Sequence, residues 1–406
     1  MKRLEVHYRG WGEQWPLGTL ADSGRSVLFE YSPEALRQGL ELSPRNLRLR
    51  REAYSGYSAG QHRLPGLIAD ALPDGWGLLV TDRLFRRGGC DPGTLSPLDR
   101  LAFIGERAIG ALAFAPASRG PHAVDDVPLL ALAQGVRELL NDRDSAVLRQ
   151  LALLGGSPHG ARPKAMVQYD ASSGAMSTDP AAAGTPWLVK FPARHEHKEV
   201  CAIENAYAEL ARRCGLSVPA TRHFDLDRTL AAFGIERFDR EAGLRVPMLT
   251  LAGLLDADFR MPQVDYLTFL RATSFLTGDQ REVFAAYARC VFNVLFHNRD
   301  DHSKNFSYRL GRDRRYRLAP VYGVTFGEGP GGEHPMDVLG ETKAPGRRHL
   351  LELAARADLD RSVAAELLDR MLAVVPEVPR LLATGVRAAT RKHIVSLVEA
   401  NAMRLR

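Results

Sequence analysis

The segment NRDDHSKN, residues 298–305, decides the fold that we expect, because it places a dense polar cluster directly behind the apolar run AAYARCVFNVLF. A solvated loop that caps a helix is one interpretation, since Asn298 and Asp301 are good turn residues. A zinc site fits less well, because His297 and His302 are five positions apart and two ligands on one helix face need a separation of four. The spacing of the other polar residues indicates a third interpretation.

Asp300 and Asn305 have the spacing of a kinase catalytic loop. Phosphoryl transfer needs a carboxylate that orients and deprotonates the attacking hydroxyl, and a side-chain oxygen on the metal that bridges the phosphates. In such a loop His302 could brace the backbone and Lys304 could neutralise phosphate charge. The runs FSYRL and YRLAPVYGV, joined by the polar turn GRDR, predict a β-hairpin whose second strand should supply another metal-binding carboxylate. The Asp–Asn spacing alone is a weak pattern.

A kinase also needs a Lys on a strand and a Glu on the following helix, and residues 185–214 offer both. Lys190 ends the short apolar run TPWLVK. In the following EVCAIENAYAELARRC, apolar residues recur at helical spacing, and Glu204 borders the face that they form. A carboxylate beside a buried face favours a cationic partner, so we expect an ion pair between Glu204 and Lys190. The alternative is two surface residues that do not touch.

The stretch LGGSPHGARPKA, residues 154–165, has the composition of a phosphate-binding loop. It is not a Walker A motif, because Ala161 and Arg162 stand where that motif has Lys and Ser or Thr. Its backbone amides and cationic side chains suit an anionic phosphate, although an ordinary surface turn is the alternative. The candidate nucleotide-binding residues here are Ser157, Gly160, Arg162 and Lys164.

The run LAAFGIERFDR, residues 230–240, predicts a strand that ends near Glu236. A strand that leads out between two lobes can offer backbone hydrogen bonds to an adenine ring. We therefore add Glu236 and Phe238 to the candidate nucleotide-binding residues, with ordinary core packing of the apolar positions as the alternative.

Composition and charge indicate a soluble globular protein. The 406 residues are enough for two or three subdomains, with 45% apolar and 25% charged residues. We expect no membrane association and a cytoplasmic location, because we find no bilayer-length apolar run, no secretory signal and no CxxC pair among the four cysteines. The net charge of +6 is spread over single arginines, which favours a soluble arginine-rich protein over direct DNA binding.

The order of predicted elements changes along the chain. Short strands (LEVHY, SVLFEY, ALAFAP) mix with helices (SPEALRQGL, LPDGWGLLVTDRLF) before a linker at 118–128. Longer helices follow, with strands near 163–240 and 306–324. The small polar stretch at 169–186 predicts a mobile loop, and from 347 onward the pattern is that of amphipathic helices.

These pieces, in this order, resemble the HipA family of serine/threonine kinases, the toxins of a bacterial type II toxin–antitoxin system. The resemblance covers nearly the whole chain, with LPDGWG and LDRLAFIGERAIGALAF in an N-terminal part and GGSPHGARPKA, WLVKFP, IERFDR, NRDDHSKNFS and YRLAPVYGV in a kinase core. It implies an α+β, two-lobed kinase-like fold with a β-rich N-terminal subdomain at 1–120. A part with the phosphate loop would follow at 121–245, and a helical lobe with the catalytic loop at 246–406.

The resemblance also implies roles and partners. Asp300 would be the catalytic Asp and Asn305 a Mg²⁺ ligand, while Lys190 would contact the phosphates of ATP with Glu204 as its helix partner. Ser157 matches a serine that such kinases autophosphorylate, which expels the phosphate loop. The family implies an aminoacyl-tRNA synthetase as substrate and a small HipB-like helix-turn-helix antitoxin that binds operator DNA together with the toxin.

One position departs from the family pattern. The strand after the catalytic loop should read like PVYD, and here it reads PVYG, so that Gly323 stands at the position of the second Mg²⁺-binding Asp. The loss of that carboxylate predicts severely impaired phosphoryl transfer. An inactivating substitution is the interpretation that we favour. A natural pseudokinase that acts as a co-repressor through antitoxin and operator DNA, and compensation by Glu328 or Glu333, are the alternatives.

Overall fold

The computed structural model describes residues 2–117, 126–156 and 158–406. Ser157, and residues 118–125 of the expected linker, lie outside the described residues. Near the N-terminus, β1 (Lys2–Tyr8), β2 (Trp15–Asp22), β3 (Val27–Tyr31) and β4 (Leu112–Ala115) form an antiparallel sheet in the order β3–β2–β1–β4. Leu4, Val6 and Tyr8 are buried and alternate with more exposed neighbours, which is the pattern of a strand with one face on a core.

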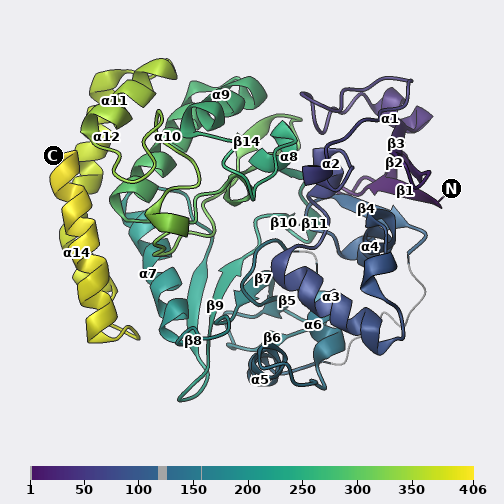
Figure 1. The fold of residues 1–406 in the computed structure, drawn as a ribbon, viewed down its shortest axis with the longest axis horizontal. Helices are drawn as coiled ribbons and strands as arrows, with labels where there is room; N and C mark the ends of the chain where they lie inside the picture. Colours follow the sequence, from purple (N-terminus) through teal and green to yellow (C-terminus); the bar gives the residue numbers. More distant parts are fainter. Residues whose placement is uncertain (1, 118–125, 157) are drawn as a thin grey trace.

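A second antiparallel sheet has the strand order β6–β5–β7–β9–β8. Its strands are β5 (Lys164–Tyr169), β6 (Met176–Ser177), β7 (Thr185–Lys190), β8 (Thr221–Asp225) and β9 (Ala231–Glu236). The register places Lys164 opposite Lys190 on the central pair of strands. This sheet lies below and between the N-terminal strands and the C-terminal helices in Figure 1.

Helices cover this second sheet. Trp76 and Val80 of α3 (Gly75–Arg87) share a hydrophobic core with α5 (Leu129–Leu140), α6 (Leu148–Gly155) and strands β5 and β7. Helix α3 therefore packs on the second sheet, although its sequence belongs to the expected N-terminal subdomain. Helix α7 (Glu199–Arg213) has the predicted buried face and packs against β8 and β9.

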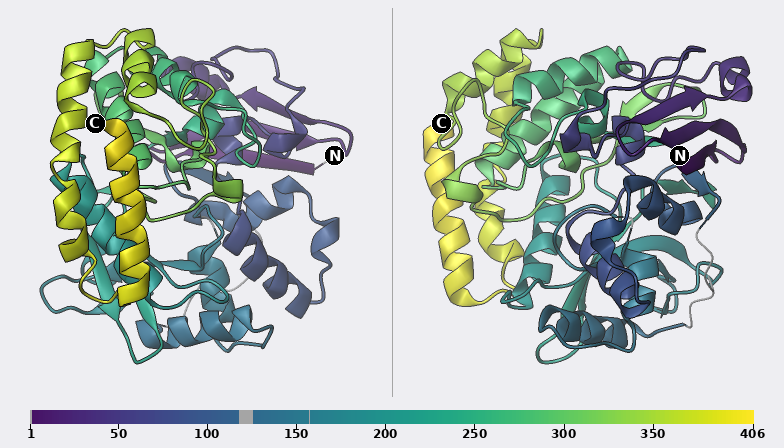
Figure 2. Two further views of the ribbon diagram at one scale, coloured as in Figure 1. Left: turned by 60° about the vertical axis from the view of Figure 1, so that its left-hand side comes forward. Right: turned by 45° about the vertical axis from the view of Figure 1, so that its right-hand side comes forward.

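The C-terminal half is mostly helical. Its long helices are α9 (Tyr266–Thr277), α10 (Gln280–Leu295), α11 (Arg347–Arg356), α12 (Arg361–Leu372) and α14 (Ala388–Leu405), with the short α13 (Val378–Leu381) between the last two. The apolar run in front of residue 298 is the buried second half of α10. Helix α14 lies at the outer edge, on the side away from the N-terminus, in Figure 1 and in the right-hand view of Figure 2.

Shorter elements connect these layers. They are α1 (Pro33–Gln38), α2 (Gly66–Ala69), α4 (Pro97–Ile104), α8 (Leu251–Leu255), the hairpin β10 (Arg240–Glu241) and β11 (Leu244–Arg245), and the sheet of β12 (Met248–Thr250), β13 (Ser307–Leu310) and β14 (Tyr316–Leu318). Single 3₁₀ turns occur at 59–61, 92–94, 105–107, 303–305, 330–332 and 375–377.

Two sequence expectations need correction. The stretch 169–186 is not a plain loop, because Met176 and Ser177 pair with β5, and the Asp170 carboxylate accepts hydrogen bonds from Ser172 and Ser173. Small polar residues here form capped turns, which their composition alone did not distinguish from a mobile loop. The predicted hairpin after residue 305 is present, but its second strand ends at Leu318, so Gly323 lies beyond it.

Candidate active site

A cavity of about 750 Å³ lies between the second sheet and the helical half. Its walls come from strands β5, β7 and β9, the loop at 158–162, and the segments 299–305 and 322–330. Every candidate site residue that the structure describes lines it, namely Gly160, Arg162, Lys164, Lys190, Glu204, Glu236, Phe238, Asp300, His302, Lys304, Asn305 and Gly323. Segments up to about 165 residues apart in the sequence thus meet at one place, while the remaining candidate, Ser157, lies outside the described residues.

The expected ion pair between Lys190 and Glu204 is present. Lys190 Nζ donates a hydrogen bond to Glu204 Oε1, and the Glu204 side chain is only 4% exposed. Arg162 approaches the other carboxylate oxygen of Glu204 at 3.7 Å and binds Glu196 at 3.0 Å. Although burial opposes the charge of Arg162, the carboxylates of Glu204 and Glu196 hold its pKa above the usual value.

Lys164 adds a second lysine, a buried one, beside the partly buried Lys190. It is buried opposite Lys190 in the sheet, and its Nζ donates a hydrogen bond to the carbonyl of His159. Burial, and then repulsion from Lys190, lowers the pKa of Lys164 to about 7. Two like charges held across neighbouring strands destabilise each other, so this arrangement favours an anion between them.

The loop at 298–305 presents Asp300 toward the cavity. The Asp300 side chain is 59% exposed, and its Oδ1 lies 3.6 Å from His302 Nε2. His302 Nδ1 accepts a hydrogen bond from the amide of Lys304 at 3.3 Å, and Asn305 Nδ2 donates to the carbonyl of Asp300 at 2.5 Å. These contacts brace the loop, and burial lowers the pKa of His302 below its usual value, which favours the neutral ring.

Two residues of this loop overturn the solvated-loop interpretation. Asn298 and Asp301 are 2% and 1% exposed. Asp301 Oδ2 accepts hydrogen bonds from Tyr266 at 2.5 Å and lies 2.8 Å from His334 Nδ1, while Asn298 donates to Asn293 at 2.8 Å. Turn propensity did not reveal this buried polar network, because its partners lie on α9, on α10 and beyond residue 330.

The ammonium group of Lys304, which was expected to neutralise phosphate charge, already has a carboxylate partner. Its Nζ forms an ion pair with Asp74 Oδ2 at 2.9 Å and lies 4.4 Å from the centre of the Phe259 ring. Asp74 belongs to the LPDGWG motif at the start of α3 and also lines the cavity. Sequence reasoning missed it, because the motif carried no chemistry until its position beside the loop was known.

Gly323 lies beside Asn305, the expected Mg²⁺ ligand. A Cβ added to Gly323 would lie 3.1 Å from Asn305 Oδ1, so a side chain here would stand next to that oxygen. Glu328 and Glu333 do not replace it: the Glu328 carboxylate lies 2.7 Å from His393 Nε2, and Glu333 pairs with Lys343 at 3.4 Å. Neither glutamate lines the cavity.

The edge of the cavity near β9 supports only part of the expected adenine contacts. The amide of Glu236 donates to the carbonyl of Ala220 at 2.8 Å, and that of Arg237 donates to Pro186 at 2.9 Å. Those two groups are therefore occupied, and a base would have to use other backbone groups near Phe238. The Phe238 ring lies 5.1 Å from that of Tyr322, which gives this edge an aromatic wall.

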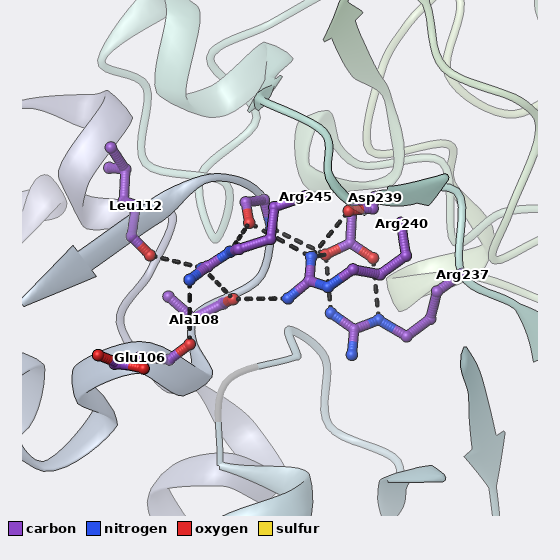
Figure 3. Close-up of polar contacts among 8 residues, drawn as sticks. Glu106, Ala108, Leu112, Arg237, Asp239, Arg240 and Arg245 are labelled. Carbon is purple, nitrogen blue, oxygen red and sulfur yellow. Dashed lines mark hydrogen bonds and ion pairs between the residues drawn. The ribbon is translucent and has the colours of Figure 1, made fainter. Parts of the chain in front are cut away.

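A buried acidic residue joins this edge to the N-terminal part of the chain. Asp239 binds Arg237 and Arg240 at 2.8 and 2.7 Å and accepts a hydrogen bond from the amide of Gly110 at 2.8 Å. Arg245 donates hydrogen bonds to the backbone carbonyls of Glu106, Ala108, Gly110 and Leu112. Figure 3 shows Arg245 together with Asp239 and its two arginine partners. Burial alone would raise the pKa of Asp239, but the two guanidinium groups that it contacts hold the pKa below the usual value.

The lining residues fit a nucleotide better than they fit a metal ion. The cavity has the volume of an ordinary small-molecule site, and Arg162, Lys164 and Lys190 supply positive charge at one end. Among the described residues, no group of three or more His, Cys, Asp or Glu side chains is arranged to hold a metal ion. Mg²⁺ prefers oxygen ligands, and Asn305 Oδ1 is the side-chain oxygen nearest to the position of a Gly323 Cβ, while Asp300 lines the same cavity.

Comparison with known proteins identifies the family. The family model described as the HipA-like C-terminal domain matches residues 156–378, which is more than half of the chain. The chain belongs to the HipA family. The model of the HipA N-terminal domain also matches, at residues 8–115.

One solved structure supports the HipA fold. The chain is similar to HipA in the complex of HipA, HipB and operator DNA from the toxin–antitoxin system of Shewanella oneidensis MR-1, with a TM-score of 0.73 and 19% identity over 99% of this chain and 97% of that one. A second similar structure, the proinflammatory kinase CtkA of Helicobacter pylori, has a TM-score of 0.39 and 11% identity over 55% and 89% of the two chains, too little to support an argument. No curated protein sequence matches significantly.

The comparisons confirm the fold class that the sequence predicted, an α+β HipA architecture of two lobes. The boundaries at 120 and 245 stay predictions. Within the described ranges, none of the helices combines the length and the apolar character needed to cross a bilayer.

Proposed function

We propose that the protein has the active-site architecture of an ATP-dependent serine/threonine protein kinase of the HipA type. The observation that carries this proposal is the convergence of the Lys190–Glu204 ion pair and the Asp300–Asn305 loop on one cavity. Asp300 would orient the hydroxyl of a protein substrate and take its proton. Lys190, Lys164 and Arg162 would bind the phosphates of ATP, and Phe238 would contact the base.

We further propose that this chain transfers phosphate poorly. When bound, Mg²⁺ neutralises the phosphate charge that develops in the reaction, and here Asn305 would hold it with a glycine at the second ligand position. The exposed Asp300 would still accept the proton of the substrate hydroxyl. His302 would still hold the backbone of the loop in place by accepting a hydrogen bond from the amide of Lys304. The loss would therefore fall on the rate of transfer more than on the binding of nucleotide.

The partners are proposed from family membership. The Shewanella HipA was solved with HipB and operator DNA, and we propose a HipB-like antitoxin and, through it, operator DNA as partners of this chain. We propose an aminoacyl-tRNA synthetase as the protein substrate and Ser157 as the autophosphorylated residue. These proposals rest on membership of the family.

The test compares phosphoryl transfer from γ-labelled ATP by the native chain and by Gly323→Asp, with phosphorylation of Ser157 read by mass spectrometry. We expect Gly323→Asp to be faster by about a hundredfold, which corresponds to about 2.7 kcal/mol of transition-state stabilisation. Adding Asp300→Asn to Gly323→Asp should abolish the gain. Equal and robust transfer by the native chain and Gly323→Asp would reject the proposed impairment.

A second candidate function is that of a non-catalytic co-repressor. The observation that favours it is Gly323 itself, together with the absence of a replacement carboxylate at Glu328 or Glu333. Binding of ATP and of the antitoxin to the same Gly323→Asp variant, measured beside phosphoryl transfer, separates the two candidates. A Gly323→Asp form that neither binds ATP nor transfers phosphate, yet still binds its antitoxin, would favour the co-repressor.

A further inference from the structure

Asp74 occupies the N-cap position of α3 but does not cap the helix. An Asp at this position normally accepts a hydrogen bond from an amide of the first helical turn, which stabilises the helix by about 1 kcal/mol. Here Asp74 has extended backbone angles, as an N-cap residue should, yet its side chain makes no capping hydrogen bond. Helix α3 therefore lacks the stabilisation of a side-chain cap, and the Asp74 carboxylate is available for contacts elsewhere.

The Asp74 carboxylate instead joins two loops of the cavity. Its Oδ1 accepts a hydrogen bond from the amide of Gly160 at 2.6 Å, and its Oδ2 forms the ion pair with Lys304 at 2.9 Å. The side chain is 4% exposed. Burial by itself disfavours the charged form, but the surrounding groups, including His159, Lys304 and the Gly160 amide, hold the pKa of Asp74 below its usual value.

The rest of the PDGWG motif, residues 73–77, fits closely against the same loop. The amide of Trp76 donates to the carbonyl of Gly160 at 3.2 Å, and the indole Nε1 donates to the carbonyl of Lys164 at 3.0 Å. A Cβ on Gly75 would lie 2.8 Å from the Gly160 carbonyl oxygen, and one on Gly77 would lie 2.5 Å from that of Gly156. Any larger residue at 75 or 77 would therefore push the loop away.

We propose that residues 73–77 form a dock that holds Gly156 and the loop at 158–164 in the nucleotide-binding position. Asp74 is the positioning residue of this dock, because it ties the Gly160 amide to Lys304 of the catalytic loop. The proposal rests on the proposed function for its consequence: release of the dock would loosen the phosphate-binding loop and free Lys304. The N-terminal part of the chain would thereby control whether the nucleotide site is assembled.

The experiment is amide hydrogen exchange on the nucleotide-free full chain, comparing native protein with Asp74→Asn. In Asp74 the Gly160 amide binds Oδ1 and Lys304 binds Oδ2. Asn replaces one of these two oxygens by an NH2 group, which donates and cannot accept, so it cannot keep both contacts in place. A hydrogen bond to a charged group contributes about 1.5–3 kcal/mol. Loss of the bond between Asp74 and the Gly160 amide should therefore raise the exchange rates of the amides at 159–162 and 164 by at least about tenfold. Asp82→Asn is the matched control, because Asp82 lies on the same helix and binds Arg100 at 2.6 Å, away from the loop.

A second variant tests the dock without changing a charge. Gly77→Ala should raise exchange of the same amides, although Ala normally stabilises a helix relative to Gly. Gly88→Ala, at the other end of α3, should not, since its Cβ would meet no atom closer than 3.4 Å. In the Gly323→Asp background, Asp74→Asn should raise the KM for ATP at least about tenfold and leave kcat within about threefold.

Unchanged exchange in both Asp74→Asn and Gly77→Ala would overturn the proposal, whether or not the protein is a kinase. Raised exchange in a chain that binds no ATP would uphold the dock and reject the proposed function. A uniform rise in exchange over the whole of α3, equal in Asp82→Asn, would reduce Asp74 to a structural residue and also overturn the proposal.

Discussion

Replacing Gly323 by Asp would restore the missing oxygen, and the structure sets the cost of doing so. Gly323 has a φ of +66°, in the left-handed region, and its added Cβ would lie 3.1 Å from Asn305 Oδ1. This conformation costs an L-residue about 1–2 kcal/mol, and Asp is among the residues that tolerate it best. We expect Gly323→Asp to lower the free energy of unfolding of the nucleotide-free protein by about 1 kcal/mol.

The benefit should appear only with nucleotide and Mg²⁺ together. The new carboxylate would stand beside the side-chain oxygen of Asn305. It would add a charged oxygen ligand for Mg²⁺, where glycine offers no side-chain ligand. We expect Mg²⁺ to tighten ADP binding by at least about tenfold in Gly323→Asp, equivalent to about 1.4 kcal/mol. In the native chain we expect a change of less than about threefold, or 0.7 kcal/mol by the same conversion.

The assay is isothermal titration of ADP with Mg²⁺ or with EDTA. Gly323→Asn is the matched control, because Asn has the size of Asp and tolerates positive φ but lacks the charge. Glu328→Gln in the native background should change nothing, since the Glu328 carboxylate is bonded to His393 outside the cavity. The same Mg²⁺ dependence in native, Gly323→Asp and Gly323→Asn proteins would refute the reasoning about position 323.

Two further predictions concern buried charges. Asp239→Asn should destabilise the protein by about 3–5 kcal/mol in urea unfolding, because it leaves Arg237 and Arg240 buried without their counter-charge; a loss below about 1 kcal/mol would contradict this. Lys164 has a pKa of about 7, and bound phosphate would raise it, so ATP affinity should be highest below pH 7 and fall as the pH rises above it. Proton uptake, measured by titration in buffers of different ionisation enthalpy at pH 8, should be present in the native chain and absent in Lys164→Met.

Much of the site could be predicted from the sequence, because the chemistry constrains spacing within a single loop or element. Asp300 and Asn305 share one loop, and Glu204 lies at the edge of a helical apolar face. The spacing of residues along the sequence therefore sufficed to predict all three. The cation expected beside Glu204 was Lys190, and the structure contains that ion pair. The register that sets Lys164 against Lys190 needs the pairing of β5 with β7, which no local pattern reveals.

Contacts between distant segments could not be predicted. Asp74 meets Lys304 across 230 positions, and Asp301 meets His334 from beyond the catalytic loop. Asp74 reads locally as a helix cap, and Asp301 as a turn residue, because short polar residues favour both positions for reasons of backbone hydrogen bonding. In the folded chain the Asp74 carboxylate instead joins two loops of the cavity, and the Asp301 carboxylate belongs to a buried polar network.

The central claim is that a nucleotide binds between β7 and the loop at 298–305. Isothermal titration of ATP into the native chain and into Lys190→Met tests it most directly, with Lys198→Met as the control because Lys198 pairs with Asp225 elsewhere at 2.6 Å. We expect ATP to bind the native chain, to bind Lys190→Met at least about tenfold more weakly, and to bind Lys198→Met with unchanged affinity. Equal affinity in native and Lys190→Met proteins, or no binding of ATP to the native chain, would contradict the central claim.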